Sequence, residues 1–306
     1  MIETAPGTLV ATSCAACSAT EAQELYPANF DVDALNAAVF SARRLPDGLH
    51  YRLVRCTGCG LVRSDPVAPA DLLAHLYRES SFDYDDEVPY LRRTYGRYLA
   101  ALDRFGARHG TLLEIGCGNG FFLDEALARG YADVRGVEPS AAAVRLAPAR
   151  LRQRIVCDVM GGDLFAASSF DVACMFQVFD HVPDPKRLLT DLQQVLRPCG
   201  LVLCFNHNVE AISARLLGER SPMVDIEHTY LYSPATMRRL FEHAGFEVLH
   251  VGPARNDLSL AHLVRLLPLP RTFKRQALGA LHGRALGRLR LSLPVGNLYL
   301  VARKPA

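Results

Sequence analysis

Three closely spaced glycines constrain the fold of this chain more than any other feature. The run follows the apolar pair Leu112-Leu113 and precedes the amphipathic stretch Phe121–Leu127; its glycines are Gly116, Gly118 and Gly120. The pattern predicts a strand, a tight turn and a helix, because glycine adopts the left-handed conformations of such a turn without strain. A turn with no side chains on its inner wall lets a ligand contact bare backbone at the start of a helix.

The spacing of these glycines separates two classes of cofactor. A dinucleotide turn has the spacing Gly-x-Gly-x-x-Gly and holds a pyrophosphate at the helix start. Here the spacing is Gly-x-Gly-x-Gly, and a carboxylate, Glu114, precedes it. A carboxylate repels a pyrophosphate and attracts a cation, so the turn favours S-adenosylmethionine, which carries a sulfonium and an ammonium. The spacing disfavours the alternative, an NAD-dependent oxidoreductase.

Further motifs follow in the order that one protein family shows. Glu138 ends the next apolar strand, and Asp158 follows a short strand. A fourth strand, Phe170–Gln177, leads into the sequence Asp180-His181-Val182-Pro183. From about residue 90 to 246, with the final strand added, the chain resembles the class I S-adenosylmethionine-dependent methyltransferases. The resemblance implies an α/β, Rossmann-like fold, in which a seven-stranded, mostly parallel sheet has helices on both faces.

The resemblance also implies roles for particular side chains at the cofactor. Glu138 is expected to bind both ribose hydroxyls, Asp158 to bind the adenine amine, and Gln177 to line the methionine end of the pocket. The complete predicted cofactor site consists of Glu114, Gly116, Gly118, Gly120, Glu138, Asp158 and Gln177.

Two matched Cys-x-x-Cys pairs near the start of the chain predict a structural zinc site. They consist of Cys14 with Cys17 and Cys56 with Cys59, and each pair can place two thiolates on one tetrahedral zinc. The alternating residues 50–55 predict a hairpin that carries the second pair, as in zinc ribbons. The 38 residues between the pairs exceed the usual spacing, which an insertion at residues 26–40 explains. Four unrelated thiols are the alternative.

Length and charge divide the chain into parts. Because 306 residues exceed one average domain, we expect a zinc-ribbon module at residues 1–66, a helical linker or lid at 67–109 and a methyltransferase domain at 110–306. Residues 1–89 contain 13 acidic residues against 6 arginines and no lysine. Nucleic-acid binding depends on Lys and Arg at the phosphates, so this charge disfavours a nucleic-acid partner.

A basic helical insertion is expected at about residues 255–295. Leucines recur there at helical spacing with Arg and Lys between them, and residues 258–306 contain no acidic residue. A solvated face on helices that pack over the core, or a homodimer contact, is the favoured interpretation. Peripheral contact with an anionic membrane and a cover over a phosphorylated acceptor are the alternatives.

The cysteines and the apolar segments bear on localisation. No stretch approaches the ~20 apolar residues that cross a bilayer. Nine cysteines without an export signal predict reduced thiols and a cytoplasmic protein.

Two histidines are the candidate general bases. An alcohol acceptor must lose a proton, and histidine has a suitable pKa to accept it. His181 lies just beyond the fourth strand, and His228 follows Glu227 on the connection after the fifth strand. The Glu227-His228 pair resembles the base arrangement of sugar C-methyltransferases that carry zinc modules. Packing, helix entry and acceptor binding are the alternative roles.

The sequence therefore predicts a methyltransferase that acts on a small-molecule or glycan-linked acceptor, with a hydroxyl favoured over carbon. A C-methyltransferase on a keto-deoxysugar nucleotide is the first alternative. A zinc-bearing RNA methyltransferase and a non-catalytic binding protein with a vestigial pocket are the others.

Overall fold

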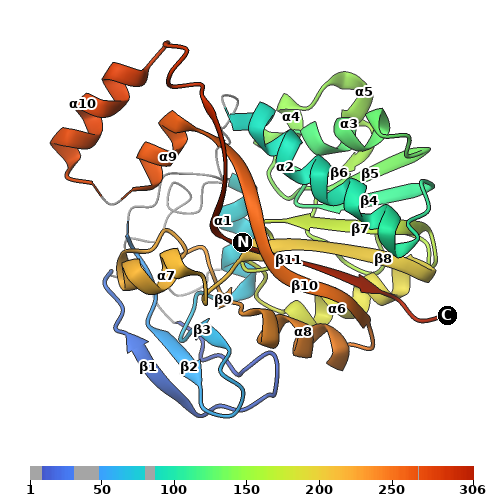
Figure 1. The fold of residues 1–306 in the computed structure, drawn as a ribbon. Helices are drawn as coiled ribbons and strands as arrows, with labels where there is room; N and C mark the ends of the chain where they lie inside the picture. Colours follow the sequence, from blue (N-terminus) through green and yellow to red (C-terminus); the bar gives the residue numbers. More distant parts are fainter. Residues whose placement is uncertain (1–8, 31–47, 80–86, 268) are drawn as a thin grey trace.

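The computed structural model describes residues 9–30, 48–79, 87–267 and 269–306. Seven strands form its central sheet: β4 (Thr111–Ile115), β5 (Asp133–Val137), β6 (Ile155–Val156), β7 (Phe170–Phe176), β8 (Leu196–His207), β10 (Glu247–Ser259) and β11 (Arg290–Arg303). Their order across the sheet is β10-β11-β8-β7-β4-β5-β6 (Figure 1).

The central sheet is mostly parallel, which confirms the predicted Rossmann-like fold. Strands β6, β5, β4, β7 and β8 run parallel to one another, and β11 pairs antiparallel with both β8 and β10. Every residue of β7 is buried, as expected for a parallel strand that is covered on both faces. The carboxyl ends of β4, β5, β7 and β8 therefore meet at one edge, where ligands of such folds bind.

Helices cover both faces of this sheet (Figure 1). One hydrophobic cluster joins it to α2 (Val88–Ala101), α3 (Phe121–Ala128) and α5 (Ala149–Arg152), next to which lies α4 (Ala141–Leu146). A second cluster joins its other face to α6 (Pro185–Val195) and α8 (Pro234–His243). Capping residues fix where the last two helices begin. The side chain of Asp184 accepts from the backbone of Arg187, and Ser233 forms a capping box with Thr236.

A small antiparallel sheet lies beside the large one. It contains β1 (Ala22–Tyr26), β2 (Leu53–Cys56), β3 (Val62–Ser64) and β9 (Tyr230–Leu231), in the order β1-β2-β3-β9. The first three strands come from the N-terminal part of the chain, whereas β9 comes from the connection that follows β8. The pairing of β3 with β9 therefore ties this connection to the N-terminal sheet.

The two sheets share one hydrophobic core. Cys14 and Leu61 of the N-terminal part are fully buried in the cluster that includes Met237 of α8. Arg63 of β3 is also fully buried, and its guanidinium donates to the carbonyls of Thr12 and Thr20. These hydrogen bonds offset part of the cost of burying the charge, although Nη1 has no hydrogen-bond partner among the described residues.

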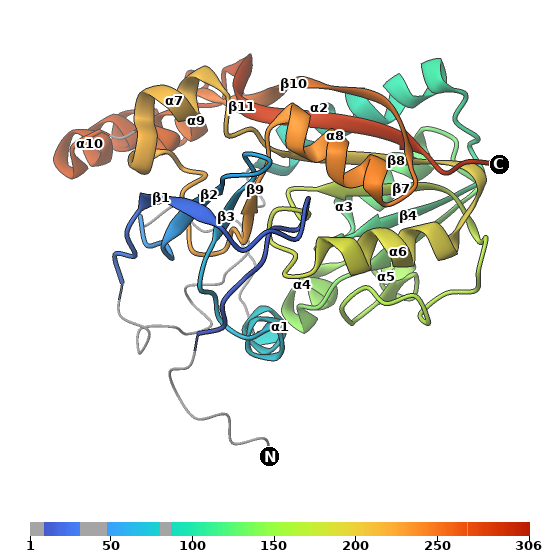
Figure 2. The same ribbon diagram turned by 90° about the horizontal axis from the view of Figure 1, so that it is seen from below.

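The remaining helices are α1 (Ala70–Glu79), η3 (Leu102–Phe105), α7 (Ile212–Leu217), η4 (Gly218–Arg220), α9 (Leu260–Leu266) and α10 (Arg271–Leu281). The last two occupy the connection between β10 and β11, within the range expected for the basic insertion. Seen from below, α7, α9 and α10 lie together on one side of the molecule (Figure 2). Among the described residues, no helix is long and apolar enough to span a membrane.

Candidate functional site

The glycine turn connects β4 to α3, as predicted. All three glycines have positive φ angles: 70° at Gly116, 55° at Gly118 and 75° at Gly120, the N-cap of α3. A Cβ atom on Gly116 would lie 2.4 Å from Cγ2 of Val178. Both the backbone conformation and the space therefore require glycine here, and the turn presses against the segment that follows β7.

Glu138 connects the glycine turn to the end of β5. Its Oε2 accepts from the backbone N–H of Gly118 at 2.8 Å, and its Oε1 accepts from that of Ser140 at 2.8 Å. Burial raises the pKa of this carboxyl, and the two amide donors act in the opposite direction. The side chain thus lies at the sheet edge where sequence places it, and its contact with a ribose stays a prediction.

The other predicted cofactor residues lie at the ends of neighbouring strands. Glu114 is buried in β4. Gln177 follows β7 with φ of 56°, a left-handed conformation that costs a non-glycine residue about 1 to 2 kcal/mol. Its Oε1 is buried and has no hydrogen-bond partner among the residues that the structure describes. Asp158 is half exposed and lies 3.3 Å from Nη2 of Arg78 on α1.

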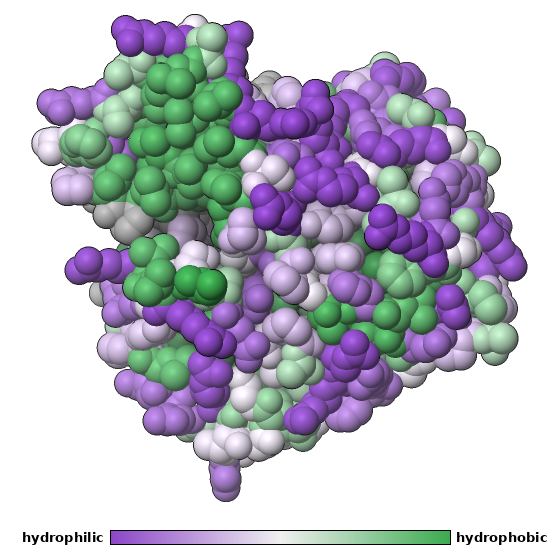
Figure 3. All heavy atoms as spheres, in the orientation of Figure 1, coloured by the Kyte–Doolittle hydropathy of each residue, from purple (hydrophilic) through white to green (hydrophobic). Residues whose placement is uncertain are grey.

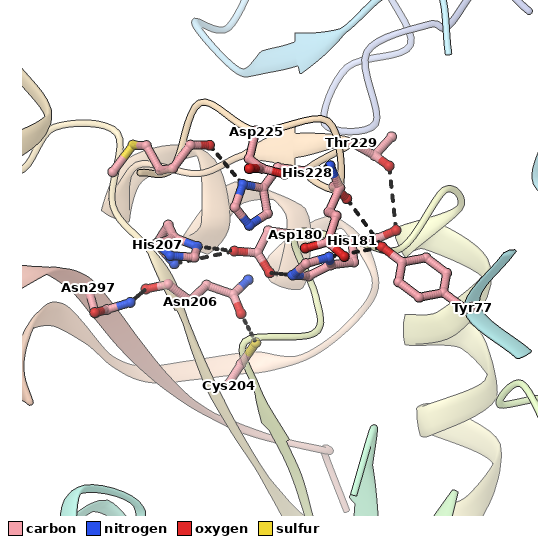
Figure 4. Close-up of polar contacts among 12 residues, drawn as sticks. Tyr77, Asp180, His181, Cys204, Asn206, His207, Asp225, His228, Thr229 and Asn297 are labelled. Carbon is pink, nitrogen blue, oxygen red and sulfur yellow. Dashed lines mark hydrogen bonds and ion pairs between the residues drawn. The ribbon is translucent and has the colours of Figure 1, made fainter. Parts of the chain in front are cut away.

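Three histidines surround the buried carboxylate of Asp180 (Figure 4). Its Oδ2 accepts from Nδ1 of His207 at 2.7 Å, and its Oδ1 lies 3.7 Å from Nε2 of His181. The ring centroid of His228 is 4.7 Å from that of His181 and 4.7 Å from that of His207. The structure therefore brings together the two histidines that the sequence singled out, and adds a third.

The sheet topology explains this convergence. Asp180 and His181 follow β7, and His207 ends the adjacent parallel strand β8. His228 comes just before β9, and the next residue, Thr229, donates its backbone N–H to the carbonyl of Asp180 at 2.9 Å. The cluster thus forms where the ends of two parallel strands meet the connection that β3 holds in place.

Hydrogen bonds also fix the orientation of the imidazole rings. Nδ1 of His228 donates to the carbonyl of Met223 at 2.7 Å, so in the neutral ring Nε2 carries the lone pair. The hydroxyl of Tyr77, on α1, lies 3.0 Å from Nδ1 of His181. From the small sheet, the hydroxyl of Ser64 donates to the carbonyl of His228 at 2.8 Å. The bond to Met223 leaves Nε2 of His228 as the ring atom that can accept a proton.

The surroundings of the cluster shift the pKa values of Asp180 and His228. Burial opposes ionisation of Asp180, but the hydrogen bond from His207 and the charges of His181 and His228 hold its pKa well below the ordinary value. Burial lowers the pKa of His228, and the charge of His207 lowers it further, while Asp180 opposes both effects. Near neutral pH, Asp180 is therefore ionised and His228 is neutral.

Sequence alone did not identify all members of this cluster. In the sequence, Asp180 is next to His181, and His207 lies in the polar run Asn206-His207-Asn208. Only the order of strands in the sheet shows that β7, which precedes Asp180, and β8, which ends at His207, are adjacent. Tyr77 lies 104 residues before His181 and carried no signal. Glu227 lies next to His228, and its carbonyl is 3.5 Å from the hydroxyl of Tyr77.

The four cysteines predicted as zinc ligands converge at one place. The Sγ atoms of Cys14 and Cys59 are 3.3 Å apart, those of Cys17 and Cys56 are 3.5 Å apart, and all four lie within 4.8 Å of one another. Four thiolates at about 2.3 Å from a tetrahedral zinc lie about 3.8 Å apart. The cluster therefore fits zinc. Ligand atoms of Asp180, His181 and His228 also lie within 4.8 Å of one another, a spacing that a metal ion can bridge.

A cavity of about 150 Å³ lies between the small sheet and α7. Its lining is mainly apolar and includes Leu53, Val62 and Met223, with Arg55 and Arg215 as charged members. A space of this volume admits a group about the size of a benzene ring. Met223 connects it to the site, because the carbonyl of Met223 holds the ring of His228.

Comparisons with known proteins identify the family of the central domain. Residues 90–251 match a methyltransferase domain family. The chain is 28% identical over 162 residues to a ubiquinone biosynthesis O-methyltransferase of Cupriavidus pinatubonensis and 31% identical over 175 residues to that of Aeromonas salmonicida. These alignments cover 48% and 51% of this chain, and 65% and 71% of the relatives. Among solved structures, the YcgJ protein of Bacillus subtilis matches with a TM-score of 0.47 and 15% identity, over 69% of this chain and 99% of that one.

Proposed function

Because the chain belongs to the class I S-adenosylmethionine-dependent methyltransferases, we propose that it methylates a hydroxyl of a small-molecule or glycan-linked acceptor. The observation that carries the proposal is the cluster of three histidines around the buried Asp180, at the same sheet edge as the glycine turn. The turn suits a cofactor and the cluster suits proton removal, and methyl transfer to an alcohol needs both.

The cofactor would be held by the turn and by the strand ends beside it. The positive φ angles at Gly116 and Gly118 give the turn a backbone that glycine adopts without strain, and Glu138 presents a carboxylate at the same place. Gln177 offers a buried carbonyl oxygen. S-adenosylmethionine supplies an electrophilic methyl group. Each of these side chains positions that group, and positioning provides much of the acceleration in such reactions.

His228 is proposed as the general base. Its Nε2 would take the proton from the acceptor hydroxyl, whose oxygen would receive the methyl group that S-adenosylmethionine supplies. Met223 fixes the tautomer that this requires. The ionised Asp180 stabilises the imidazolium that forms, and its hydrogen bond with His207 holds the carboxylate in place. His181, held by Tyr77, would contact the acceptor beside the base.

Hydroxyl and carbon acceptors remain the two candidate classes. The names of the two relatives describe O-methylation in ubiquinone biosynthesis, which supports a hydroxyl. The adjacent Glu227 and His228, with Tyr77 nearby, support the alternative of C-methylation on a keto-deoxysugar nucleotide, because the same base could remove a proton from carbon. The convergence of two strand ends on one imidazole serves either reaction.

We also propose that the four thiolates hold a structural zinc ion that supports the site at a distance. Cys56 ends β2 and Cys59 precedes β3, so the proposed ion fixes the hairpin from which Ser64 reaches the backbone of His228. The metal would act through the fold and take no part in the chemistry.

A transfer assay with radiolabelled S-adenosylmethionine tests the function. Phenols, sugar nucleotides, lipid-linked glycans and bulk RNA are offered as acceptors, and NMR distinguishes an O-methyl from a C-methyl product. We expect an O-methyl product, and we expect His228→Gln to lower kcat by about 10² to 10⁴ while S-adenosylhomocysteine still binds. His250→Gln, at a half-buried surface position of β10, is the matched control. Full activity of His228→Gln would remove the base assignment, and no binding of S-adenosylhomocysteine would remove the function.

A further inference from the structure

In the part of the chain that the structure describes, the helices between β10 and β11 bury none of their apolar side chains fully. Four of the seven residues of α9 are Leu or Val, yet none of its residues is buried. Residues 272–281 of α10 are likewise exposed or half-buried. A helix that belongs to a core buries its apolar stripe, and helices of 7 and 11 residues gain little stability on their own in water. Packing over the core therefore does not account for these residues.

Exposed apolar side chains concentrate on this side of the molecule. Figure 3 shows a broad hydrophobic area over α9 and α10 and a smaller one over α7 on the same face. Ile212 and Leu216 of α7 are 78% and 80% exposed, and Phe273 of α10 is 57% exposed. Of the large apolar residues that are exposed in the described part of the chain, six lie in this region: Ile212, Leu216, Leu267, Phe273, Leu286 and Leu289. Such concentration marks an interaction surface.

The charges around this surface select the partner. Residues 258–306 contain no acidic residue. From the end of β10 to the start of β11, the basic residues include Arg265, Lys274, Arg275, Arg284, Arg288 and Arg290. Among the described residues, the acidic side chains near this surface include Glu210 and Glu219 beside α7, and Glu87, whose Oε1 lies 3.7 Å from Nδ1 of His262 on α9. A second copy of the chain would place basic side chains against basic side chains, which is unfavourable. Anionic lipid head groups complement the charge, and the acyl region below them accommodates the apolar side chains.

We propose that α7, α9 and α10 form a docking face for an anionic lipid membrane. Phe273, Ile212 and Leu216 enter the boundary between head groups and acyl chains, and the basic side chains lie at the level of the phosphates. Membrane docking goes beyond methyl transfer, because it needs neither the cofactor turn nor the Asp180 cluster.

Co-sedimentation with vesicles tests the docking face directly. The protein of 306 residues is mixed with vesicles of phosphatidylglycerol and phosphatidylcholine in equal parts, and with vesicles of phosphatidylcholine alone. We expect binding to the anionic vesicles that weakens as salt rises. Phe273→Ser should weaken binding about 10- to 100-fold, because one large apolar side chain is lost from the apolar layer. The double reversal Arg275→Glu with Arg284→Glu should weaken it at least about 25-fold, since each charge contributes about fivefold.

Matched controls come from elsewhere on the surface. Leu146 of α4 is 57% exposed, like Phe273, and Leu146→Ser should leave vesicle binding unchanged. Arg238 of α8 is 42% exposed, and Arg238→Glu serves the same purpose for charge. Unchanged binding of S-adenosylhomocysteine shows that each variant is folded. Lack of vesicle binding, equal binding to neutral vesicles, or a dimer in sedimentation velocity that Phe273→Ser abolishes would each overturn the proposal.

Discussion

Replacing Asp180 by Asn is the sharpest test of the histidine cluster, because it removes one buried charge and almost no volume. The carboxylate is fully buried, hydrogen-bonded to His207 at 2.7 Å and 3.7 Å from Nε2 of His181. A hydrogen bond to a charged group such as this carboxylate contributes about 1.5 to 3 kcal/mol. Asn recovers part of this because it is cheaper to bury. We therefore expect the free energy of unfolding to fall by about 2 kcal/mol.

Urea unfolding of the ligand-free protein at pH 7 measures this cost without knowledge of the acceptor. The matched control is Asp184→Asn, which removes a charge four residues away but keeps a good N-cap for α6, so we expect a change of only a few tenths of a kcal/mol. S-adenosylhomocysteine should bind the Asp180 variant as it binds the parent protein. A loss below about 1 kcal/mol would refute the view that the surrounding imidazoles stabilise this carboxylate.

Three further predictions concern the cofactor turn, the base and the metal. Glu138→Gln should weaken binding of S-adenosylhomocysteine about 10- to 100-fold in calorimetry, because a charged acceptor is lost; an unchanged affinity would contradict its role. Because burial lowers the pKa of His228, its ring should stay neutral as pH falls below about 6.5 and take up a proton only at lower pH. A proton NMR titration measures this, and the His228 resonance is identified by its absence in His228→Gln. A titration midpoint above about 6.5 would contradict the prediction. Metal analysis should find one zinc equivalent, which is lost in Cys56→Ser. The matched control is Cys199→Ser, because Cys199 is exposed and lies outside the cluster, and this variant should keep the zinc. A second equivalent that disappears with His181→Gln would instead assign a metal to the Asp180 cluster.

Local pattern was enough to predict the strand, turn and helix at the glycines. The three positive φ angles and the close approach of Val178 to Gly116 are what the spacing required. The paired spacing of the cysteines likewise predicted a cluster, since each Cys-x-x-Cys turn brings two sulfurs together and two such turns supply the four ligands of one zinc, as the convergence of the four sulfurs bears out.

Long-range pairing is the part that sequence could not supply. Nothing in the order of residues places Tyr77 beside His181, or puts Ser64 against the backbone of His228. The strand β9 has only two residues, too few for a periodic pattern, and it exists because β3 pairs with it. The leucines of the segment that forms α9 and α10 have helical spacing. Whether they face the core or the outside depends on tertiary packing, which this spacing does not reveal.

The short strand β9 has a consequence for how the enzyme matures. Strand β3 binds the backbone at and after position 228, because Ser64 donates to the carbonyl of His228 and Arg63 pairs with Tyr230. The proposed base is therefore held by two distant parts of the chain. The proposed cofactor site, by contrast, takes its residues from the ends of β4, β5 and β7. If the proposals for zinc and for the base both hold, a newly made chain without zinc would have an incomplete base, and the supply of metal would limit how much active enzyme forms.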